Sequence, residues 1–188
     1  LVSNCGGYVT AGKLAQQLGI KSTATVLEYL SYFEQSYLIQ LLPKFAYSYR
    51  AQIVNPRKIY IIDNGLVNSV SQSFAPDMGR KLENTVFWAI RRQSKEIYYY
   101  NETGSECDFV ICQNKKTVQL VQVCSGLNVD NTRREETGLF TAMEHFGLTE
   151  GIIVTLDQSD IMKHKNRIIR VLPAFEFLQN SAKWCLST

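Results

Sequence analysis

Acidic and neutral polar residues recur at strand spacing in the segment from Ser105 to Cys124. Glu106 and Asp108 alternate with apolar residues, and Gln122 and Cys124 do the same further along the segment. Side chains two positions apart share one face of a strand, so each pair faces the same way. A carboxylate buried among apolar neighbours is unfavourable unless something binds it. The pattern therefore predicts a site, or the remains of one.

Two strands joined by a tight turn position these residues. Apolar and β-branched residues dominate on both sides of the polar turn Asn114–Lys116, which is typical of strands. We expect strands over residues 106–112 and 117–124. A helix over residues 79–92 precedes them and has a buried apolar stripe, with Glu83 at its border.

The remaining elements of this second half follow from the same periodicities. Residues 151–156 are almost wholly apolar, which indicates a strand covered on both faces. The charged run Arg133–Glu136 is interpreted as the solvated start of a helix. Further elements are expected over residues 96–101 (strand), 132–146 (helix), 167–172 (strand) and 173–179 (helix). The order is α-β-β-β-α-β with an extra β-α, which predicts an α/β (α+β) domain with a mixed sheet over residues 69–188.

The first half has the outline of a winged helix-turn-helix, with a domain predicted over residues 1–68. Thr10 is a suitable N-cap for a short helix that Gly19 ends, and Ser22 or Thr23 begins a second helix reaching Gln35. Two helices joined so tightly are typical of helix-turn-helix units. Strands are expected over residues 37–42 and 58–63, with the loop from Pro43 to Pro56 between them as the wing.

This unit suggests contact with nucleic acid. The second helix would place Thr23, Thr25 and Tyr29 in a groove of duplex DNA, and basic residues of the wing would lie on phosphates. Those basic residues are Lys44, Arg50, Arg57 and Lys58.

The exposed face of the same helix carries no Arg or Lys, although base readout normally relies on Arg, Lys, Asn or Gln. Sequence-specific DNA binding, weak non-specific contact, and a structural or protein-docking role therefore all stay open.

Composition narrows the class of protein. The chain has 188 residues, 45% of them apolar and 20% charged, as in ordinary globular proteins. The net charge is +3, and residues 1–60 hold six Lys and Arg against two Glu. This basic first third is compatible with nucleic acid.

The cellular context follows from further absences in the sequence. No apolar run approaches the ~20 residues of a membrane span. Five cysteines, an odd number without a C-x-x-C pair, favour a reducing cytoplasm. Because the chain opens on Leu1 rather than Met, we expect it to be a piece of a longer protein.

The order of elements, with Glu83, Asp108 and the Gln122-x-Cys124 pair in place, resembles the restriction-endonuclease-like PD-(D/E)XK superfamily. Together with the upstream winged helix, the motifs Gly-Arg-Lys-Leu-Glu-Asn (79–84) and Glu-Cys-Asp-Phe-Val (106–110) are similar to the C-terminal region of prokaryotic AAA-type ATPases. In those proteins a P-loop ATPase domain precedes a domain of unknown function. The resemblance implies an upstream ATPase domain as partner, with ATP bound there. No Gly-x-x-x-x-Gly-Lys-Ser/Thr motif occurs in this chain.

The superfamily chemistry implies roles for these positions. Glu83, Asp108 and Gln122 would be the catalytic set, with Asp108 and Gln122 as weak ligands of Mg²⁺ or Mn²⁺. The strand pattern of the superfamily is acid-x-Lys. In this chain Gln122 replaces the acidic residue and Cys124 replaces the lysine. A thiol cannot replace an ammonium electrostatically. We therefore expect a degenerate centre in a nucleic-acid- or partner-binding module. An active metal-dependent phosphodiesterase and a purely regulatory docking module are the alternatives.

Overall fold

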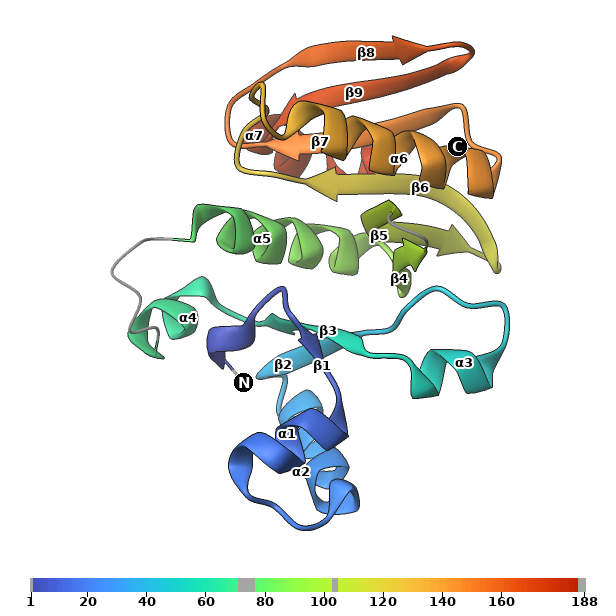
Figure 1. The fold of residues 1–188 in the computed structure, drawn as a ribbon. Helices are drawn as coiled ribbons and strands as arrows, with labels where there is room; N and C mark the ends of the chain where they lie inside the picture. Colours follow the sequence, from blue (N-terminus) through green and yellow to red (C-terminus); the bar gives the residue numbers. More distant parts are fainter. Residues whose placement is uncertain (1, 71–76, 103–104, 186–188) are drawn as a thin grey trace. The chain divides into compact units, whose positions relative to one another are not determined.

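The structure is a computed structural model that describes residues 2–70, 77–102 and 105–185 (Figure 1). The chain divides into two compact units, Leu1–Pro76 and Asp77–Thr188. The domain boundary predicted between residues 68 and 69 falls inside helix α4 (Asn64–Val70). None of the described helices is long and apolar enough to cross a membrane.

The first unit combines helices with a small antiparallel sheet. The strand order is β1-β3-β2, and β3 pairs with both neighbours, for example through Tyr8↔Lys58 and Leu41↔Ile59. Its elements are η1 (Val2–Asn4), β1 (Tyr8–Val9), α1 (Ala11–Leu18), α2 (Thr23–Gln35), β2 (Ile39–Leu42), α3 (Tyr49–Val54), β3 (Arg57–Ile61) and α4 (Asn64–Val70).

The predicted caps of the first two helices are confirmed. The Thr10 hydroxyl accepts a hydrogen bond from the backbone N–H of Lys13, and Gly19 ends α1 with a left-handed φ of 67°. Ser22 caps α2 through the N–H of Thr25. Val26 and Leu30 of α2 are buried in the core of this unit.

The predicted loop between Pro43 and Pro56 was wrong in part, because it contains α3. Ser48 caps this helix by accepting from the N–H of Ala51. The segment after β3 is also helical, since the Asp63 carboxylate accepts from the N–H of Gly65 at the start of α4. Both helices are short and carry weak periodicity, so side-chain caps mark them better than apolar spacing.

The second unit is a mixed sheet flanked by helices, as predicted, and the sheet has six strands. Strands β4-β5-β6 and the β8-β9 pair are antiparallel, whereas β6-β7-β9 are parallel, giving the order β4-β5-β6-β7-β9-β8. The elements are α5 (Met78–Gln93), β4 (Glu96–Glu102), β5 (Ser105–Gln113), β6 (Lys116–Val123), α6 (Thr132–Phe146), β7 (Glu150–Thr155), β8 (Asp160–His164), β9 (Arg167–Pro173), α7 (Ala174–Gln179) and α8 (Ser181–Cys185).

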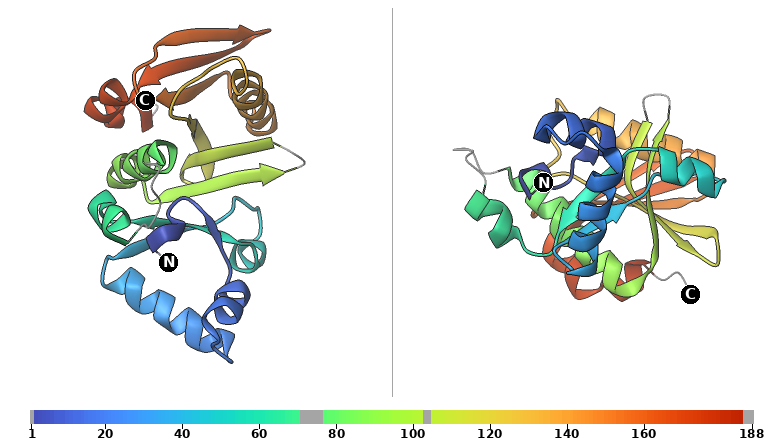
Figure 2. Two further views of the ribbon diagram at one scale, coloured as in Figure 1. Left: turned by 60° about the vertical axis from the view of Figure 1, so that its left-hand side comes forward. Right: turned by 90° about the horizontal axis from the view of Figure 1, so that it is seen from below.

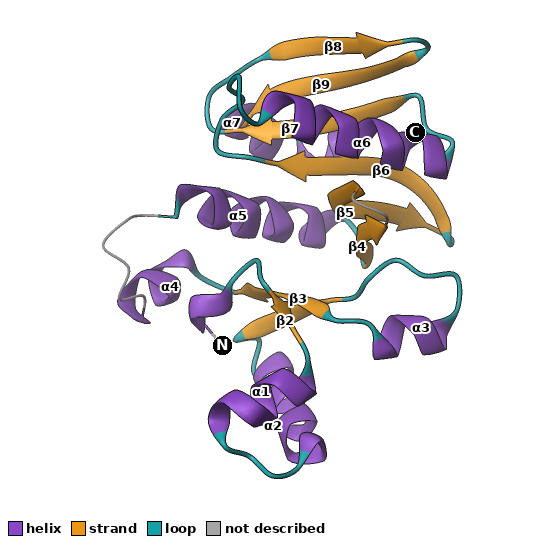
Figure 3. Ribbon diagram, viewed as in Figure 1, coloured by secondary structure: helices purple, strands orange, loops and turns teal. Residues whose placement is uncertain are grey.

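The helices of this unit lie on two faces of the sheet (Figures 2 and 3). Helix α6 packs over β5, β6, β7 and β9, while α5, α7 and α8 pack together on the other side. Glycines permit the close approach of α6. A Cβ at Gly138 would lie 3.0 Å from the backbone oxygen of Glu106, and one at Gly151 would lie 3.0 Å from the sulfur of Met143.

Two elements of this unit were not predicted. Strand β8 is exposed along most of its length and lacks the apolar alternation that marks a strand; its pairing with β9 makes it one. Helix α8 follows α7 directly after Asn180. The turn between β5 and β6 was predicted, and Asn114 and Lys115 there have positive φ values of 51° and 65°, as a two-residue type I′ hairpin requires.

Candidate functional site

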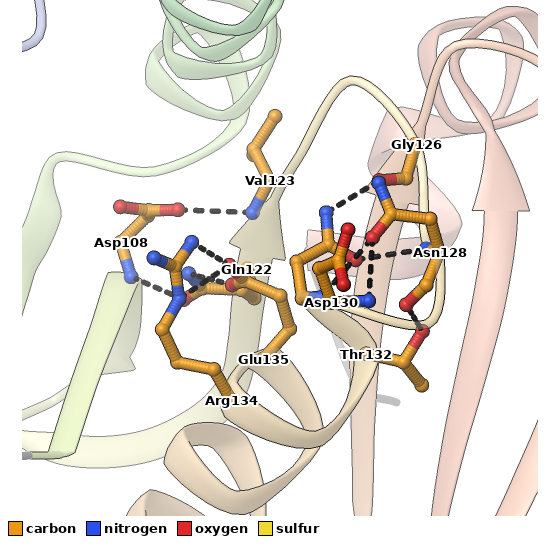
Figure 4. A network of polar contacts seen from close by, with 10 residues as sticks. Asp108, Gln122, Val123, Gly126, Asn128, Asp130, Thr132, Arg134 and Glu135 are labelled. Carbon is orange, nitrogen blue, oxygen red and sulfur yellow. Dashed lines mark hydrogen bonds and ion pairs between the residues drawn. The ribbon is translucent and has the colours of Figure 1, made fainter.

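The candidate site lies where β5 and β6 separate. Their pairing ends at Phe109↔Val121, and β6 continues alongside β7 through Val123↔Val154. Beyond that point side chains replace the backbone ladder (Figure 4). The N–H of Asp108 donates to Oε1 of Gln122 at 3.1 Å, and the N–H of Val123 donates to Oδ2 of Asp108 at 2.9 Å. Asp108 and Gln122 are thus in contact, and both are buried.

A residue that the sequence analysis did not select completes this network. Nε2 of Gln122 donates to Oε2 of Glu135 at 2.8 Å, and Nη2 of Arg134 donates to Oε1 of Glu135 at 2.6 Å. The Glu135 side chain is 6% exposed and the Arg134 side chain is 81% exposed. We call Asp108, Gln122, Arg134 and Glu135 the fork network.

The interpretation of Arg133–Glu136 as a solvated run was therefore wrong at Glu135. Helix α6 buries Leu139 and Met143, and Glu135 precedes Leu139 by four positions, so it belongs to the same stripe. Gly138 brings this turn of α6 close to β5. The helical phase of Glu135 was a usable signal in the sequence, although the acidic and basic neighbours masked it.

Cys124 follows β6 and lies beside the network. Burial, together with the nearby Glu135 and Asp108 carboxylates, raises the pKa of its thiol to about 12, against smaller opposing effects of the Gly126 backbone and Arg134. The thiol is therefore neutral at ordinary pH and supplies no cation to the site. The exposed cation nearby is Arg134, and its hydrogen bond to Glu135 raises the pKa of the guanidinium.

The loop between β6 and α6 is held by polar side chains (Figure 4). Oδ1 of Asn128 accepts from the N–H groups of Asp130 and Asn131, and the Asn131 amide donates to the Gly126 carbonyl at 2.8 Å. The Gln158 side chain bonds both the N–H and the carbonyl of Leu127. These contacts fix where α6 begins, and hence where Arg134 and Glu135 lie.

The donor set does not form a preorganised site for a divalent cation. Oδ2 of Asp108 and Oε1 of Gln122 each accept a backbone N–H, and both oxygens of Glu135 accept side-chain donors. Within the described ranges, no three His, Cys, Asp or Glu side chains are grouped so that they could hold a metal ion.

Glu83 comes from a different layer of the unit. It is half-buried on α5. That helix packs its Phe87 ring 6.1 Å from the Phe109 ring, on the face of β5 opposite to Asp108. The role predicted for Glu83 stays a prediction.

The residues predicted to contact nucleic acid are spread over the first unit. On α2, Thr23 and Tyr29 are exposed and Thr25 is half-buried. Arg50 lies on α3 and is exposed, whereas Lys44 and Arg57 are half-buried.

Lys58 differs from the other cations of that set. It is 3% exposed, and its ammonium lies 5.6 Å from the centre of the Tyr8 ring. Because Lys58 is buried, its side chain offers little surface for contact with a phosphate.

Beside α2 lies a groove of about 440 Å³, mainly apolar in its lining. Leu27 and Leu30 of α2 border it on one side, and Ile53 and Val54 of α3 on the other. Leu27, Ile53 and Val54 are 56%, 51% and 75% exposed. Apolar side chains of this size at a surface are typical of an interaction site.

Comparisons with known proteins identify relatives for both units. Residues 78–177 match the family described as Domain of unknown function (DUF4143), and residues 1–77 match Domain of unknown function (DUF8612). The chain is 31% identical over 166 residues to the Uncharacterized protein MJ1544 of Methanocaldococcus jannaschii, covering 83% of this chain and 36% of that protein. No solved structure matches it. The prediction of a domain of unknown function in the second half is thus confirmed.

Proposed function

The chain belongs to the DUF4143 family through residues 78–177, and from this premise we propose that it is a nucleic-acid- or partner-binding module of an AAA-type ATPase with a nuclease-like centre that does not cut. The observation that carries the proposal is the fork network. Oε1 of Gln122 and Oδ2 of Asp108, on the two residues that would bind a cation in an active nuclease, each accept a backbone N–H instead.

Cys124 supports the same conclusion. The superfamily places a lysine at this position to stabilise negative charge, and the Cys124 thiol stays neutral with a pKa of about 12. Loss of one such charge stabiliser typically lowers a rate by about 10²–10³. Arg134 is a cation nearby, but its guanidinium is committed to Glu135.

The topologies support the two finer fold assignments. In the first unit, the order β1-α1-α2-β2-β3 with sheet order β1-β3-β2 is compatible with a winged helix in which α3 lies within the wing. In the second, α5-β4-β5-β6-α6-β7 is compatible with a restriction-endonuclease-like fold. The curated relative is longer than the matched region. An ATPase domain with bound ATP elsewhere in the same polypeptide is part of the proposal.

The net charges of the two units indicate which unit would attract a negatively charged partner. Residues 1–76 contain six Lys and Arg and three Asp and Glu, whereas residues 77–188 contain fourteen of each kind, so the whole net charge of +3 belongs to the first unit. This favours the first unit as the one that attracts phosphates. The apolar groove beside α2 favours a second candidate, docking of the ATPase region of the same polypeptide on that groove.

A cleavage assay tests the inactive centre. The chain is incubated with plasmid and junction DNA in Mg²⁺ or Mn²⁺, and we expect no cutting. The double variant Gln122→Glu/Cys124→Lys restores the acid-x-Lys pattern and is the informative comparison. Any cutting that it gains shows that the residues at these two positions account for the inactivity of the unmodified chain. Cutting by the unmodified chain that Asp108→Ala abolishes would establish the active enzyme instead.

A binding assay separates nucleic acid from partner docking. If the first unit binds duplex DNA through phosphates, affinity falls steeply with salt, and the triple variant Lys44→Ala/Arg50→Ala/Arg57→Ala lowers the salt slope by about 3. Replacing Lys95, Lys163 and Lys183 of the second unit by Ala is the matched control. Absence of binding at low salt favours docking on the groove beside α2.

A further inference from the structure

A second polar region lies on the outer flank of α6. It is a pocket of about 360 Å³ between that helix and the β8–β9 hairpin. The volume is at the lower end of the ~300–1,000 Å³ of small-molecule sites. Its lining includes Arg133, Phe140, Glu144, His164, Lys165 and Arg167.

Helical spacing and hairpin register bring these side chains together. Arg133, Glu136, Phe140 and Glu144 recur every three or four positions and form one stripe of α6. On the hairpin, His164 pairs with Arg167 across the strands. The ring centres of Phe140 and His164 are 5.4 Å apart. The stripe and the hairpin therefore form the two walls of the pocket.

Arg167 occupies a position where the strand would otherwise be apolar. It shares a face of β9 with Ile169 and Val171, which are 0% and 1% exposed. Its Nε is buried and, among the described residues, has no hydrogen-bond partner. A buried N–H without an acceptor is unfavourable, and such a group in a native structure calls for an explanation. A ligand that supplies the acceptor is one explanation.

The charges of the pocket are not paired with one another. In the described part of the chain, no ion pair involves Arg133, Lys165 or Arg167, although Glu136 and Glu144 also line the walls. Three cations against two carboxylates leave one net positive charge. The ligand that matches is an anion with oxygens that accept from a guanidinium fork.

We propose that the pocket between α6 and the β8–β9 hairpin binds a phosphate group, with Arg167 Nε–H as the buried donor and Arg133 and Lys165 at the rim. The Phe140–His164 pair provides an aromatic wall for the group that carries the phosphate. The pocket shares no lining residue with the proposed DNA contacts of the first unit or with the fork network. Phosphate binding in the pocket can therefore be tested separately from the proposed function.

Nuclear magnetic resonance of the arginine side chains tests this directly. The ¹H–¹⁵N signal of Arg167 Nε, assigned by its loss in Arg167→Lys, is followed while inorganic phosphate, the dinucleoside monophosphate TpT or thymidine is added to the full chain. At constant ionic strength we expect a saturable shift of this signal with a phosphate-containing probe and none with thymidine. Saturation by inorganic phosphate alone points to a free phosphate or monoester, and saturation by TpT points to a diester such as a nucleic-acid backbone.

Variants at the rim keep the test decisive if Arg167 variants fold poorly. Arg133→Gln and Lys165→Gln change exposed side chains, and each is expected to weaken phosphate binding by about tenfold. Lys163→Gln removes the same charge from the same hairpin outside the pocket lining and is expected to leave binding unchanged. The proposal is overturned if neither phosphate probe moves the Arg167 signal, or if Lys163→Gln weakens binding as much as Lys165→Gln.

Discussion

Two consecutive arginines, on opposite flanks of α6, differ in their hydrogen-bonding environments. On the inner flank, Arg134 donates to Glu135, which also accepts from Gln122, and that amide in turn accepts from Asp108. On the outer flank, Arg133 faces a pocket in which Arg167 holds a buried Nε–H without an acceptor among the described residues. The inner flank pairs its polar side chains with one another, whereas on the outer flank Arg133, Lys165 and Arg167 form no ion pair within the described residues.

This difference shows which region is suited to hold a ligand. A ligand entering the fork network must break existing hydrogen bonds, and each one broken removes part of the binding energy. A phosphate entering the outer pocket gives a buried donor the acceptor it lacks. The region that resembles a catalytic centre in sequence is thus the one whose groups are already satisfied.

The largest effect that would sharpen this comparison is expected for Glu135→Ala. It removes the acceptor of the buried Gln122 amide and of Arg134, so we expect a loss of about 2–3 kcal/mol in the free energy of unfolding. Urea denaturation measures this. Glu136→Ala, at the neighbouring position on the outer flank, is the control and should change stability by less than about 0.5 kcal/mol. Equal losses in the two variants would mean that Glu135 is not part of a buried network.

Asp108→Ala is expected to rank second. It leaves the N–H of Val123 without its carboxylate acceptor, at a loss of about 1–2 kcal/mol. Asp108→Asn keeps an acceptor oxygen there and should lose less. If the asparagine variant is the less stable of the two, the negative charge of Asp108 contributes more to stability than its hydrogen bond.

Cys124 makes a smaller, pH-dependent contribution. Burial, Glu135 and Asp108 raise the pKa of its thiol from 9.0 in the unfolded chain to about 12. Above pH 9 the unfolded chain therefore releases a proton that the folded chain keeps, so the stability contribution is complete below pH 9 and declines as the pH rises toward 12. The stability of Cys124→Ala relative to the unmodified chain should improve from pH 7 to pH 10. Parallel pH curves for the two proteins would contradict the raised pKa.

The smallest effects are expected on the outer flank. Arg133→Gln and Lys165→Gln alter exposed side chains that make no ion pair in the described part of the chain, so stability should change by no more than about 0.5 kcal/mol. Thermal unfolding with and without inorganic phosphate measures both quantities at once. Stabilisation of the unmodified chain by phosphate that these variants lack would strengthen the contrast, and a large loss of stability without phosphate would break it.

The sequence alone determined the elements whose signals are local. Thr10, Gly19 and Ser22 set the ends of α1 and α2 through caps, and the Asn114–Lys115 turn set the β5–β6 hairpin. Period-two spacing selected Asp108 and Gln122, which the structure brings into contact. Strong apolar periodicity similarly gave α5, α6, β7 and β9 to within a few residues.

Only the tertiary structure decided which polar groups meet. Strand β8 is recognised through its pairing with β9, and Lys58 is buried by where its strand lies, neither of which local spacing specifies. Glu135 becomes buried because Gly138 lets α6 approach β5. Nε of Arg167 is buried because α6 packs against β9. Caps, turns and periodicity act over a few residues along the chain, whereas burial and hydrogen bonding of a polar side chain depend on elements that are distant in sequence and adjacent in space.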